Sequence, residues 1–318
     1  MKIPLEPVAI EGLVLQELQT GADKYTLTKR LHDLAGGTQG KFPGPSPVSI
    51  DRGDYTTLKN AMYVVCEKTD GWRACLLLTK YNGLQLAVLF DRKLTPYIFS
   101  IQHVPTALWQ GSVFDGEVAF NTKTQQWDYL IFDALRVSGI PIFYRSFLQR
   151  IEVAYKAWEA YSFDETHDVV RVRIKRFVPQ ADLEALAGHL ANVAQEFKTD
   201  GIVLTPDLPG IVYGRHRALF KLKTIHSVDF LVDQSGKGLC VYDSQARMHV
   251  KVGTLAGRKL ADAGSIVECV FDKGQSWKLV CVRLDKTEAN DMLTYQKTKL
   301  NAQENITVDE ICHVLLSA

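Results

Sequence analysis

The sequence predicts an α+β protein in which a large domain of antiparallel sheets and helices is followed by a small β domain. Three observations indicate this: short apolar runs separated by turn residues over 60–135, two helical patterns between 146 and 197, and five closely spaced apolar runs after Thr224. The chain has 318 residues, of which 46% are hydrophobic and 23% charged, enough for one large or two moderate domains.

The composition also limits the possible partners and compartments. The net charge of +1 means that any nucleic-acid contact must come from a local patch. Six scattered cysteines without a Cys-x-x-Cys pair favour buried thiols in a reducing, intracellular compartment over disulfides or a zinc site. Met1–Val14 is too mixed for a signal peptide, and no run approaches the roughly 20 apolar residues that cross a membrane.

The first part of the chain combines a helix, a loop and a hairpin. Leu27, Leu31 and Leu34 share one face of a helix within 1–35, and the Gly- and Pro-rich stretch 36–47 is expected to be a fixed loop. Asn82-Gly83 joins two apolar runs and predicts a type I′ hairpin. Further strands are expected at Tyr97–Ile101, Val113–Phe120, Trp127–Leu135, Val169–Phe177, Ile202–Thr205 and Ala218–Leu222.

Two helices are predicted between these strands. Ser146 is placed to cap the first, which would continue to about Tyr161. The second is expected over Pro179–Phe197, with an inward face at every third or fourth residue: Leu183, Leu186, Leu190 and Val193.

After Thr224 the pattern is that of a small β domain. Strands are expected at Val228–Val232, Gly238–Tyr242, Met248–Val252, Ser265–Phe271 and Trp277–Leu284, with a helix at Leu255–Ala263. Five strands in about 60 residues suit an OB-type barrel. We therefore expect domains at 1–226 and 227–300, and a helical tail at 301–318 that packs back on the first domain, with Thr307 capping its helix.

The motif that organises these elements is Cys66-Glu67-Lys68-Thr69-Asp70-Gly71-Trp72-Arg73, between the apolar runs 61–65 and 74–78. The pattern K-x-D-G-x-R places Lys68 where a strand ends, and Gly71 lets the backbone approach a phosphate closely. It indicates a lysine nucleophile that takes a nucleotide as a phosphoamide. The alternative is a hairpin turn with ordinary surface charges.

Other short motifs follow Lys68 along the chain. They are Phe114-Asp115-Gly116-Glu117, Tyr129–Leu135, Asp200-Gly201-Ile202-Val203, Leu219-Phe220-Lys221-Leu222-Lys223 and Arg283-Leu284-Asp285-Lys286. Taken singly, these are a turn, a solvated strand face or a surface salt bridge. Their order, spacing and placement on strands agree, which favours a shared site.

Together these motifs resemble the covalent lysyl nucleotidyltransferases, which comprise mRNA capping guanylyltransferases and ATP-dependent DNA and RNA ligases. The resemblance runs from about Phe42 to Asn290. It looks like the capping branch because of Phe42-Pro43-Gly44 with Pro47-Val48-Ser49, Val172–Phe177, and Arg283-x-Asp285-Lys286. The departures are Ala289, where capping enzymes often have proline, and Leu222, where they often have tryptophan.

The resemblance implies a nucleotidyltransferase domain of the ligase and capping type (ATP-grasp-like) plus an OB-fold lid. It also implies that Lys68 takes GMP from GTP and passes it to the 5′-diphosphate end of RNA. Implied catalytic residues are Lys68, Arg73, Glu117, Lys221, Lys223, Arg283, Asp285 and Lys286. Implied GTP contacts are Thr69, Asp70, Gly71, Phe132, Lys175 and Val203, and implied ligands of Mg²⁺ or Mn²⁺ are Glu117 and Asp200.

The resemblance also suggests individual roles. Phe132 and Val203 would cover the two faces of guanine, Arg73 would contact the ribose and Lys175 the guanine edge, although Phe132 could instead be a core residue. Asp115 and Asp133 could simply orient neighbouring side chains.

Physical arguments accompany the charged roles. Lys221 and Lys223 are two apart on a strand, so both side chains point to one face and suit one α-phosphate. Nearby cations disfavour the ammonium form of Lys68, which must lose a proton to attack. The motif at 283–286 would reach the β- and γ-phosphates only if the small domain closes, with a hinge near Thr224–Ser227.

Two other functions remain open. One is a polynucleotide ligase that loads AMP from ATP, and the other is an inactive RNA-binding or scaffold module of the same fold. Intact Lys68, Glu117, Lys221 and Lys223 argue against the inactive module. If the chain caps RNA, separate RNA triphosphatase and cap methyltransferase polypeptides are expected. Stand-alone relatives of this size suggest a large DNA virus or a unicellular eukaryote, and so a nucleus or a cytoplasmic viral factory.

Overall fold

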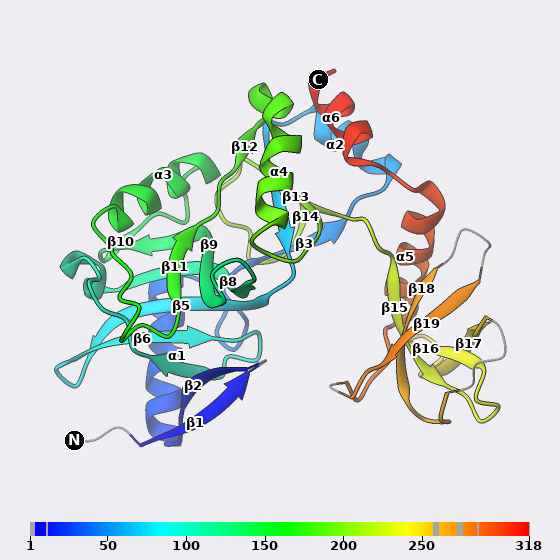
Figure 1. Cartoon of the computed structure of the whole chain (residues 1–318), viewed down its shortest axis with the longest axis horizontal. Helices are drawn as coiled ribbons and strands as arrows, with labels where there is room; N and C mark the ends of the chain where they lie inside the picture. Colours follow the sequence, from blue (N-terminus) through cyan, green and yellow to red (C-terminus); the bar gives the residue numbers. More distant parts are fainter. Residues whose placement is uncertain (1–3, 11, 257–260, 272–275, 285, 318) are drawn as a thin grey trace. The chain divides into compact units, whose positions relative to one another are not determined.

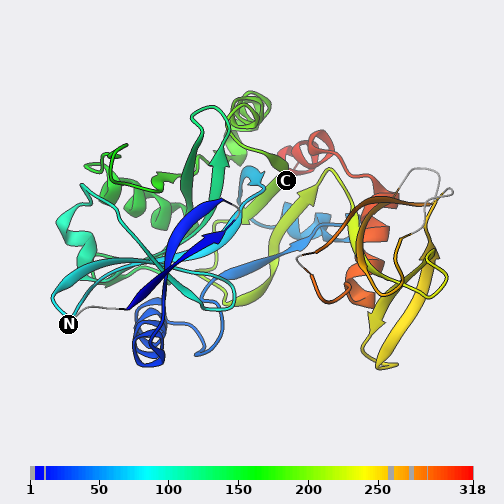
Figure 2. The same cartoon turned by 60° about the horizontal axis from the view of Figure 1, so that its bottom comes forward.

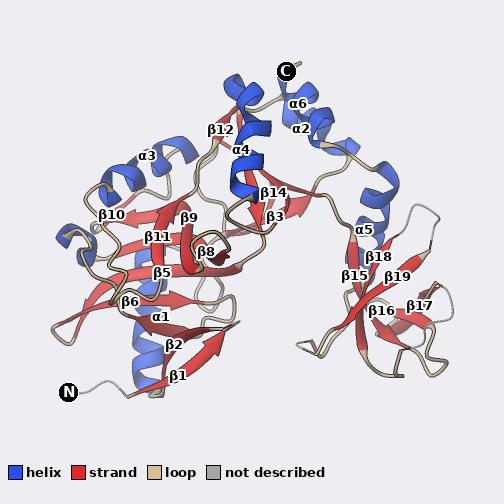
Figure 3. Ribbon diagram, in the orientation of Figure 1, coloured by secondary structure: helices blue, strands red, loops and turns tan. Residues whose placement is uncertain are grey.

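The computed structural model describes residues 4–10, 12–256, 261–271, 276–284 and 286–317. It is a mixed α/β protein with three largely antiparallel sheets and few helices (Figure 3). The chain forms two compact units. The large unit comprises Met1–Val48, Thr57–Lys221 and Leu315–Ala318, and the small unit comprises Ser49–Thr56 and Leu222–Val314.

A nine-stranded sheet forms most of the large unit (Figure 1). Its order is β1-β2-β7-β6-β5-β8-β9-β10, and β11 pairs with β9 in parallel. The strands are β1 (Leu5–Ile10), β2 (Leu13–Leu18), β5 (Trp72–Tyr81), β6 (Leu84–Phe90), β7 (Pro96–Phe99), β8 (Ser112–Asn121), β9 (Gln126–Val137), β10 (Ile140–Pro141) and β11 (Arg171–Ile174). The β1–β2 hairpin was not among the predicted elements, whereas both β8 and β9 were predicted as strands.

The hairpin of β5 and β6 confirms the turn predicted at Asn82-Gly83. Both turn residues have positive φ angles, 50° and 80°, as a type I′ turn requires. The strands pair from Tyr81↔Leu84 to Cys75↔Phe90. Side chains alternate between the two faces of β5, so that Leu76 and Leu78 pack in one apolar cluster and Cys75 and Leu77 in another.

A second sheet of five strands has the order β12-β4-β13-β14-β3. Its members are β3 (Pro45–Ser49), β4 (Tyr63–Thr69), β12 (Val178–Pro179), β13 (Thr199–Pro206) and β14 (Gly214–Lys223). The loop expected over 36–47 therefore ends earlier, where β3 begins. β4 belongs to this sheet and β5 to the other, so Asp70-Gly71 passes between two sheets and does not close a hairpin.

Helices lie on opposite faces of the nine-stranded sheet (Figure 2). α1 (Gly21–Ala35) buries Leu27 and Leu31 against one face, as predicted. α3 (Phe147–Trp158) packs Ala154 and Trp158 on the other face, and Ser146 caps it in a capping box. The short helix α2 spans Tyr55–Lys59.

The prediction of one continuous helix over Pro179–Phe197 was wrong. A 3₁₀ helix, Gln180–Ala185, contains a non-helical residue at Asp182 and is followed by α4 (Leu186–Ala194). Within α4, Leu186 and His189 are buried, whereas Leu190 and Val193 are only half-buried.

In the small unit, all five predicted strands are present. They are β15 (Ser227–Val232), β16 (Gly238–Asp243), β17 (Met248–Thr254), β18 (Ile266–Phe271) and β19 (Trp277–Val282), paired in the order β17-β16-β15-β18-β19. Their apolar core includes Phe230, Trp277 and Tyr295. The helix expected at Leu255–Ala263 falls partly outside the described residues.

Two helices end the chain. α5 (Met292–Glu304) is capped by Asp291. At the start of α6 (Val308–Leu316), the Glu310 N–H donates to the Thr307 hydroxyl, so Thr307 caps this helix as predicted. In the part of the chain that the structure describes, no helix is long and apolar enough to cross a membrane.

Candidate active site

Lys68 lies at the end of β4, next to the point where the chain crosses between sheets. Its Nζ is 2.7 Å from Oδ1 of Asp200, and the two side chains are 23% and 22% exposed. Asp200 stands in β13 beside an irregularity in the β4–β13 pairing, where Gly201 has a φ of 146°. The pairing thus brings the predicted nucleophile and a predicted metal ligand into contact.

Lys175 occupies a very different position, directly after β11. Its Nζ is 2.6 Å from Oε1 of Glu117, 2.7 Å from the Thr69 hydroxyl and 3.4 Å from Oε1 of Glu67. The residue is only 5% exposed. Burial alone would lower the pKa of Lys175, but the carboxylates of Glu117 and Glu67 raise it above its ordinary value. This amine is held as a buried cation.

A buried contact between β4 and α4 was missed by the sequence analysis. Oε2 of Glu67 is 2.9 Å from Nε2 of His189 on α4. Burial tends to raise the pKa of Glu67, but the hydrogen bond from His189 and the charge of Lys175 bring it below its ordinary value. The available signal was a glutamate inside an apolar strand, because a buried carboxylate requires a partner.

Arg73 is fixed by contacts on β8 and β3. Its Nε and Nη2 donate to the Asp115 carboxylate at 3.1 and 2.5 Å, and Nη2 also donates to the Pro45 carbonyl at 2.7 Å. Burial raises the pKa of Asp115 to about 6, although Arg73 opposes the shift. The guanidinium carbon lies 4.9 Å from the ring centre of Phe42 and 5.3 Å from that of Phe132.

The remaining large-unit candidates comprise half-buried, buried and exposed side chains. Phe132 and Val203 are half-buried between buried neighbours, and Val203 pairs with Cys66 of β4. Asp133 is buried in a two-point ion pair with Arg150, at 2.7 and 2.8 Å, so it orients that arginine. Asp70 forms a 2.7 Å ion pair with Lys198.

Lys221 and Lys223 lie near the end of β14 and are half-buried. Phe220 and Leu222 alternate with them and are buried. The two lysines therefore share one face of the strand, as predicted from their spacing.

The small unit holds the rest of the motif set. Nη1 of Arg283 is 3.2 Å from Oδ1 of Asp229, and the Lys286 ammonium pairs with the other oxygen of that carboxylate. Asp285 lies outside the described residues.

The donor set for a metal consists of carboxylates only. Among the described residues, no three His, Cys, Asp or Glu side chains gather in a way that could hold an ion. Glu117 and Asp200 are each ion-paired to a lysine. Magnesium is commonly held by one or two carboxylates together with substrate phosphates, and these two oxygen donors fit that mode.

Relatives of the chain were found both by sequence and by structure. The mRNA-capping enzyme subunit alpha of Schizosaccharomyces pombe is 24% identical over 96% of this chain and 87% of its own length. The mRNA-capping enzyme of Caenorhabditis elegans is 24% identical over 96% of this chain and 55% of its own length. A mycobacterial DNA ligase D complexed with ATP and MES is 11% identical, with a TM-score of 0.46, over 76% of this chain and 95% of that one.

Family models match nearly the whole length. The model of the mRNA capping enzyme catalytic domain matches residues 7–225, and that of the C-terminal domain matches residues 221–312. The first match alone covers more than half of the 318 residues. The chain therefore belongs to the mRNA capping enzyme family.

Proposed function

We propose that this chain is an mRNA guanylyltransferase that moves GMP from GTP, through a covalent lysyl-N–GMP on Lys68, to the 5′-diphosphate end of RNA. The observation that carries the proposal is Lys68 itself. It ends a strand within the matched catalytic domain, is partly exposed, and is held 2.7 Å from Asp200. Removal of the RNA γ-phosphate and cap methylation are assigned to separate polypeptides.

The reaction consists of two transfers at one phosphorus atom. Lys68 Nζ attacks the α-phosphorus of GTP, a P–N bond forms, and the bond to the bridging oxygen breaks to release pyrophosphate. A terminal oxygen of the RNA diphosphate then attacks the same phosphorus, the P–N bond breaks, and the amine is restored. Asp200, in contact with the amine, is placed to hold the proton that Lys68 must lose.

Side chains around Lys68 are assigned to the nucleotide. Phe132 and Val203 would cover the faces of guanine, which their half-buried positions allow. Arg73, which is held in place by its hydrogen bonds to Asp115, would contact the ribose. Lys175 and Thr69, already hydrogen-bonded to each other, would present polar atoms to the guanine edge. Asp70 and Gly71 would bring the turn close to the nucleotide, and Lys221 and Lys223 would stabilise the charge that develops on the α-phosphate.

We assign the divalent cation, Mg²⁺ or Mn²⁺, to Glu117 and Asp200 together with phosphate oxygens. When bound there, it would neutralise phosphate charge and compete with Lys68 for the Asp200 carboxylate.

The small unit is assigned a role in the first transfer. We assign it an OB-type barrel over 227–300, supported by the five-stranded order, with 301–318 as a tail and 1–226 as the nucleotidyltransferase domain. Arg283, Asp285 and Lys286 would orient the leaving pyrophosphate when this unit acts as a lid. Arg283→Ala and Lys286→Ala should then lose labelling by GTP but bind GMP almost normally. Equal loss of GMP binding would overturn the lid role.

One gel experiment tests the central proposal. The protein is incubated with divalent metal and α-labelled GTP or ATP, denatured, and examined for label on the polypeptide. Label is expected from GTP, and it should be released by acid and retained in alkali, as for a phosphoamide. Preferential labelling by ATP would instead assign the chain as a polynucleotide ligase.

A further inference from the structure

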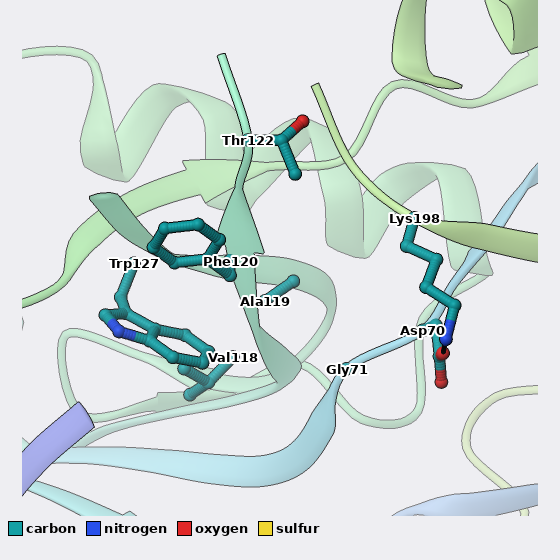
Figure 4. A pocket seen from close by; sticks show the side chains of 8 residues that line it. All are labelled: Asp70, Gly71, Val118, Ala119, Phe120, Thr122, Trp127 and Lys198. Atoms are coloured by element: carbon teal, nitrogen blue, oxygen red, sulfur yellow. Dashed lines mark ion pairs between the residues drawn. The ribbon is translucent and has the colours of Figure 1, made fainter. Parts of the chain in front are cut away.

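A pocket of about 370 Å³ adjoins the turn that follows Lys68 (Figure 4). It is lined by Asp70-Gly71, the end of β8 from Val118 to Phe120, Thr122, Trp127 and Lys198. We propose that this pocket binds the single-stranded acceptor RNA near its 5′ end, with a base stacked on Trp127 and its edge against Phe120. The proposal rests on the proposed function, because the RNA acceptor is the second substrate of that reaction.

The pocket is tied to the nucleophile through the backbone. Asp70, two residues after Lys68, donates its N–H to the Lys198 carbonyl at 2.8 Å, and the two side chains form a 2.7 Å ion pair. Gly71 packs tightly on β8, since a Cβ there would lie 2.7 Å from the Val118 carbonyl oxygen. One wall of the pocket is therefore a rigid continuation of the Lys68 strand.

The opposite wall is aromatic. Phe120 and Trp127 face each other in the register of β8 and β9, with ring centres 5.2 Å apart and planes at 63°. Phe120 is 38% exposed, and Trp127 is half-buried. Figure 4 shows the two rings on one side of the pocket and the Lys198–Asp70 pair on the other. Exposed aromatic faces beside a cation are the surface on which sequence-independent proteins stack unpaired bases.

A basic depression of about 400 Å³ adjoins the same β8–β9 turn, lined by Lys123, Thr124, Arg171, Arg173 and Glu196. Asp128, which is buried, holds Arg171 at 2.8 and 2.9 Å, and Arg173 pairs with Glu196 at 2.5 Å. The turn itself is anchored by the Thr122 N–H on the Glu196 carbonyl. Fixed guanidinium groups and Lys123 offer donors to the RNA backbone.

The combination selects RNA over a protein partner. Two aromatic rings lie beside one short turn, and Lys123 and two carboxylate-held arginines adjoin the same turn. A single strand presents a base and a phosphate at each step. A peptide partner would be bound mainly by burial of apolar side chains, and it would make no use of the adjoining basic side chains. Because the chain carries a net charge of only +1, a local arrangement of this kind is also how it must attract a polyanion.

The test separates the two transfers. The lysyl-GMP form of the parent, Trp127→Ala, Trp127→Phe and Lys123→Ala is made with labelled GTP, freed of nucleotide, and mixed with 5′-diphosphate RNA of about ten nucleotides, within the span of one single-strand site. Pyrophosphate, which reverses the first transfer without RNA, serves as a second acceptor. Tyr25→Ala, an exposed aromatic on α1, is the matched control.

For Trp127→Ala we expect the RNA concentration at half-maximal transfer to rise about tenfold, the effect of removing one base-stacking ring. In Trp127→Phe, this RNA concentration should return most of the way to the parent value. Lys123→Ala should make the transfer rate less dependent on salt concentration. Reversal by pyrophosphate should stay at the parent level in all variants. Tyr25→Ala should match the parent throughout.

Two results would overturn the subsite. One is unchanged transfer to RNA in Trp127→Ala, which would leave the pocket to another class of partner. The other is an equal loss of reversal by pyrophosphate, which would mean that the ring supports the adduct and not the RNA. Failure of the parent to take label from GTP would instead overturn the proposed function, so the two failures are distinguishable.

Discussion

Lys68 and Lys175 are chemically identical, and their surroundings give them opposite properties. Lys68 is 23% exposed at the end of a strand and contacts the carboxylate of Asp200. Lys175 is buried, and its amine contacts Glu117, Thr69 and Glu67. A reactive amine must be able to shed its proton and move, whereas a buried cation with several acceptors is fixed in both charge and position. Burial and the number of acceptors therefore separate a reactive amine from a fixed cation.

The largest effect is expected from removing the reactive amine. Lys68→Ala should abolish labelling by GTP, because it removes the amine to which the phosphoamide is assigned, and should leave the melting temperature near that of the parent. Lys80→Ala, at an exposed position on β5, is the control and should label normally. Label persisting in Lys68→Ala would assign the nucleophile elsewhere.

Next in size are two variants that remove one charged group each. Glu117→Ala and Lys223→Ala should each lower the rate of adduct formation by about two orders of magnitude, as expected for one preorganised charge-stabilising group. Glu117→Ala should also unfold at a lower urea concentration, because it strips a partner from buried Lys175. Near-normal labelling with normal unfolding in either variant would refute its assignment.

Replacing each lysine with methionine tests whether Lys175 contributes more to stability than Lys68 does. Lys175→Met should lower the free energy of unfolding by about 3–5 kcal/mol, because it leaves buried carboxylates without their cation. Lys68→Met should cost no more than about 1 kcal/mol, since its ion pair is partly exposed. Urea titrations measure both. Similar losses in the two variants would show that the two sites are not distinct.

The smallest effect concerns the pH dependence of stability. The pKa of Glu67 is lower in the folded protein than in the unfolded chain, so its stabilising contribution is complete above about pH 4.3 and is lost as the pH falls further. The difference in unfolding free energy between parent and Glu67→Gln should therefore shrink on acidification. Urea titrations from neutral pH down to about pH 3, below the unfolded-state pKa of glutamate, would show it. A difference that grows at low pH would contradict the stabilisation of the Glu67 carboxylate by His189 and Lys175.

Local patterns in the sequence predicted most of the strands and the residues on their faces. The Asn82-Gly83 turn, the Ser146 cap and the alternation of Lys221 and Lys223 were all confirmed, because each depends on a few adjacent residues. Partners across sheets could not be predicted in this way. The destination of β5 after Asp70-Gly71 depends on tertiary pairing, since the same dipeptide can close a hairpin or connect two sheets.

The charged residues of the candidate site show the same limit. The resemblance to the nucleotidyltransferase family selected Lys175, Arg73 and Asp115, but it could not reveal that Lys175 is surrounded by carboxylates or that Arg73 is fixed on Asp115. His189 was missed because it is a polar residue on the buried face of α4, three positions after Leu186, where the apolar pattern alone did not select it. Such contacts join residues that are 42 to 122 positions apart, beyond any local pattern.

The position of Lys175 has a consequence for how the large unit unfolds. Its amine contacts Glu67 and Thr69 of β4 in one sheet and Glu117 of β8 in the other. Separating the two sheets would break the ion pairs between the Lys175 amine and the carboxylates of Glu67 or Glu117. A partly opened state of the large unit is therefore unfavourable. The two sheets should therefore behave as one cooperative unit, and backbone amides of β4 should exchange with deuterium at the same protection as those of β8.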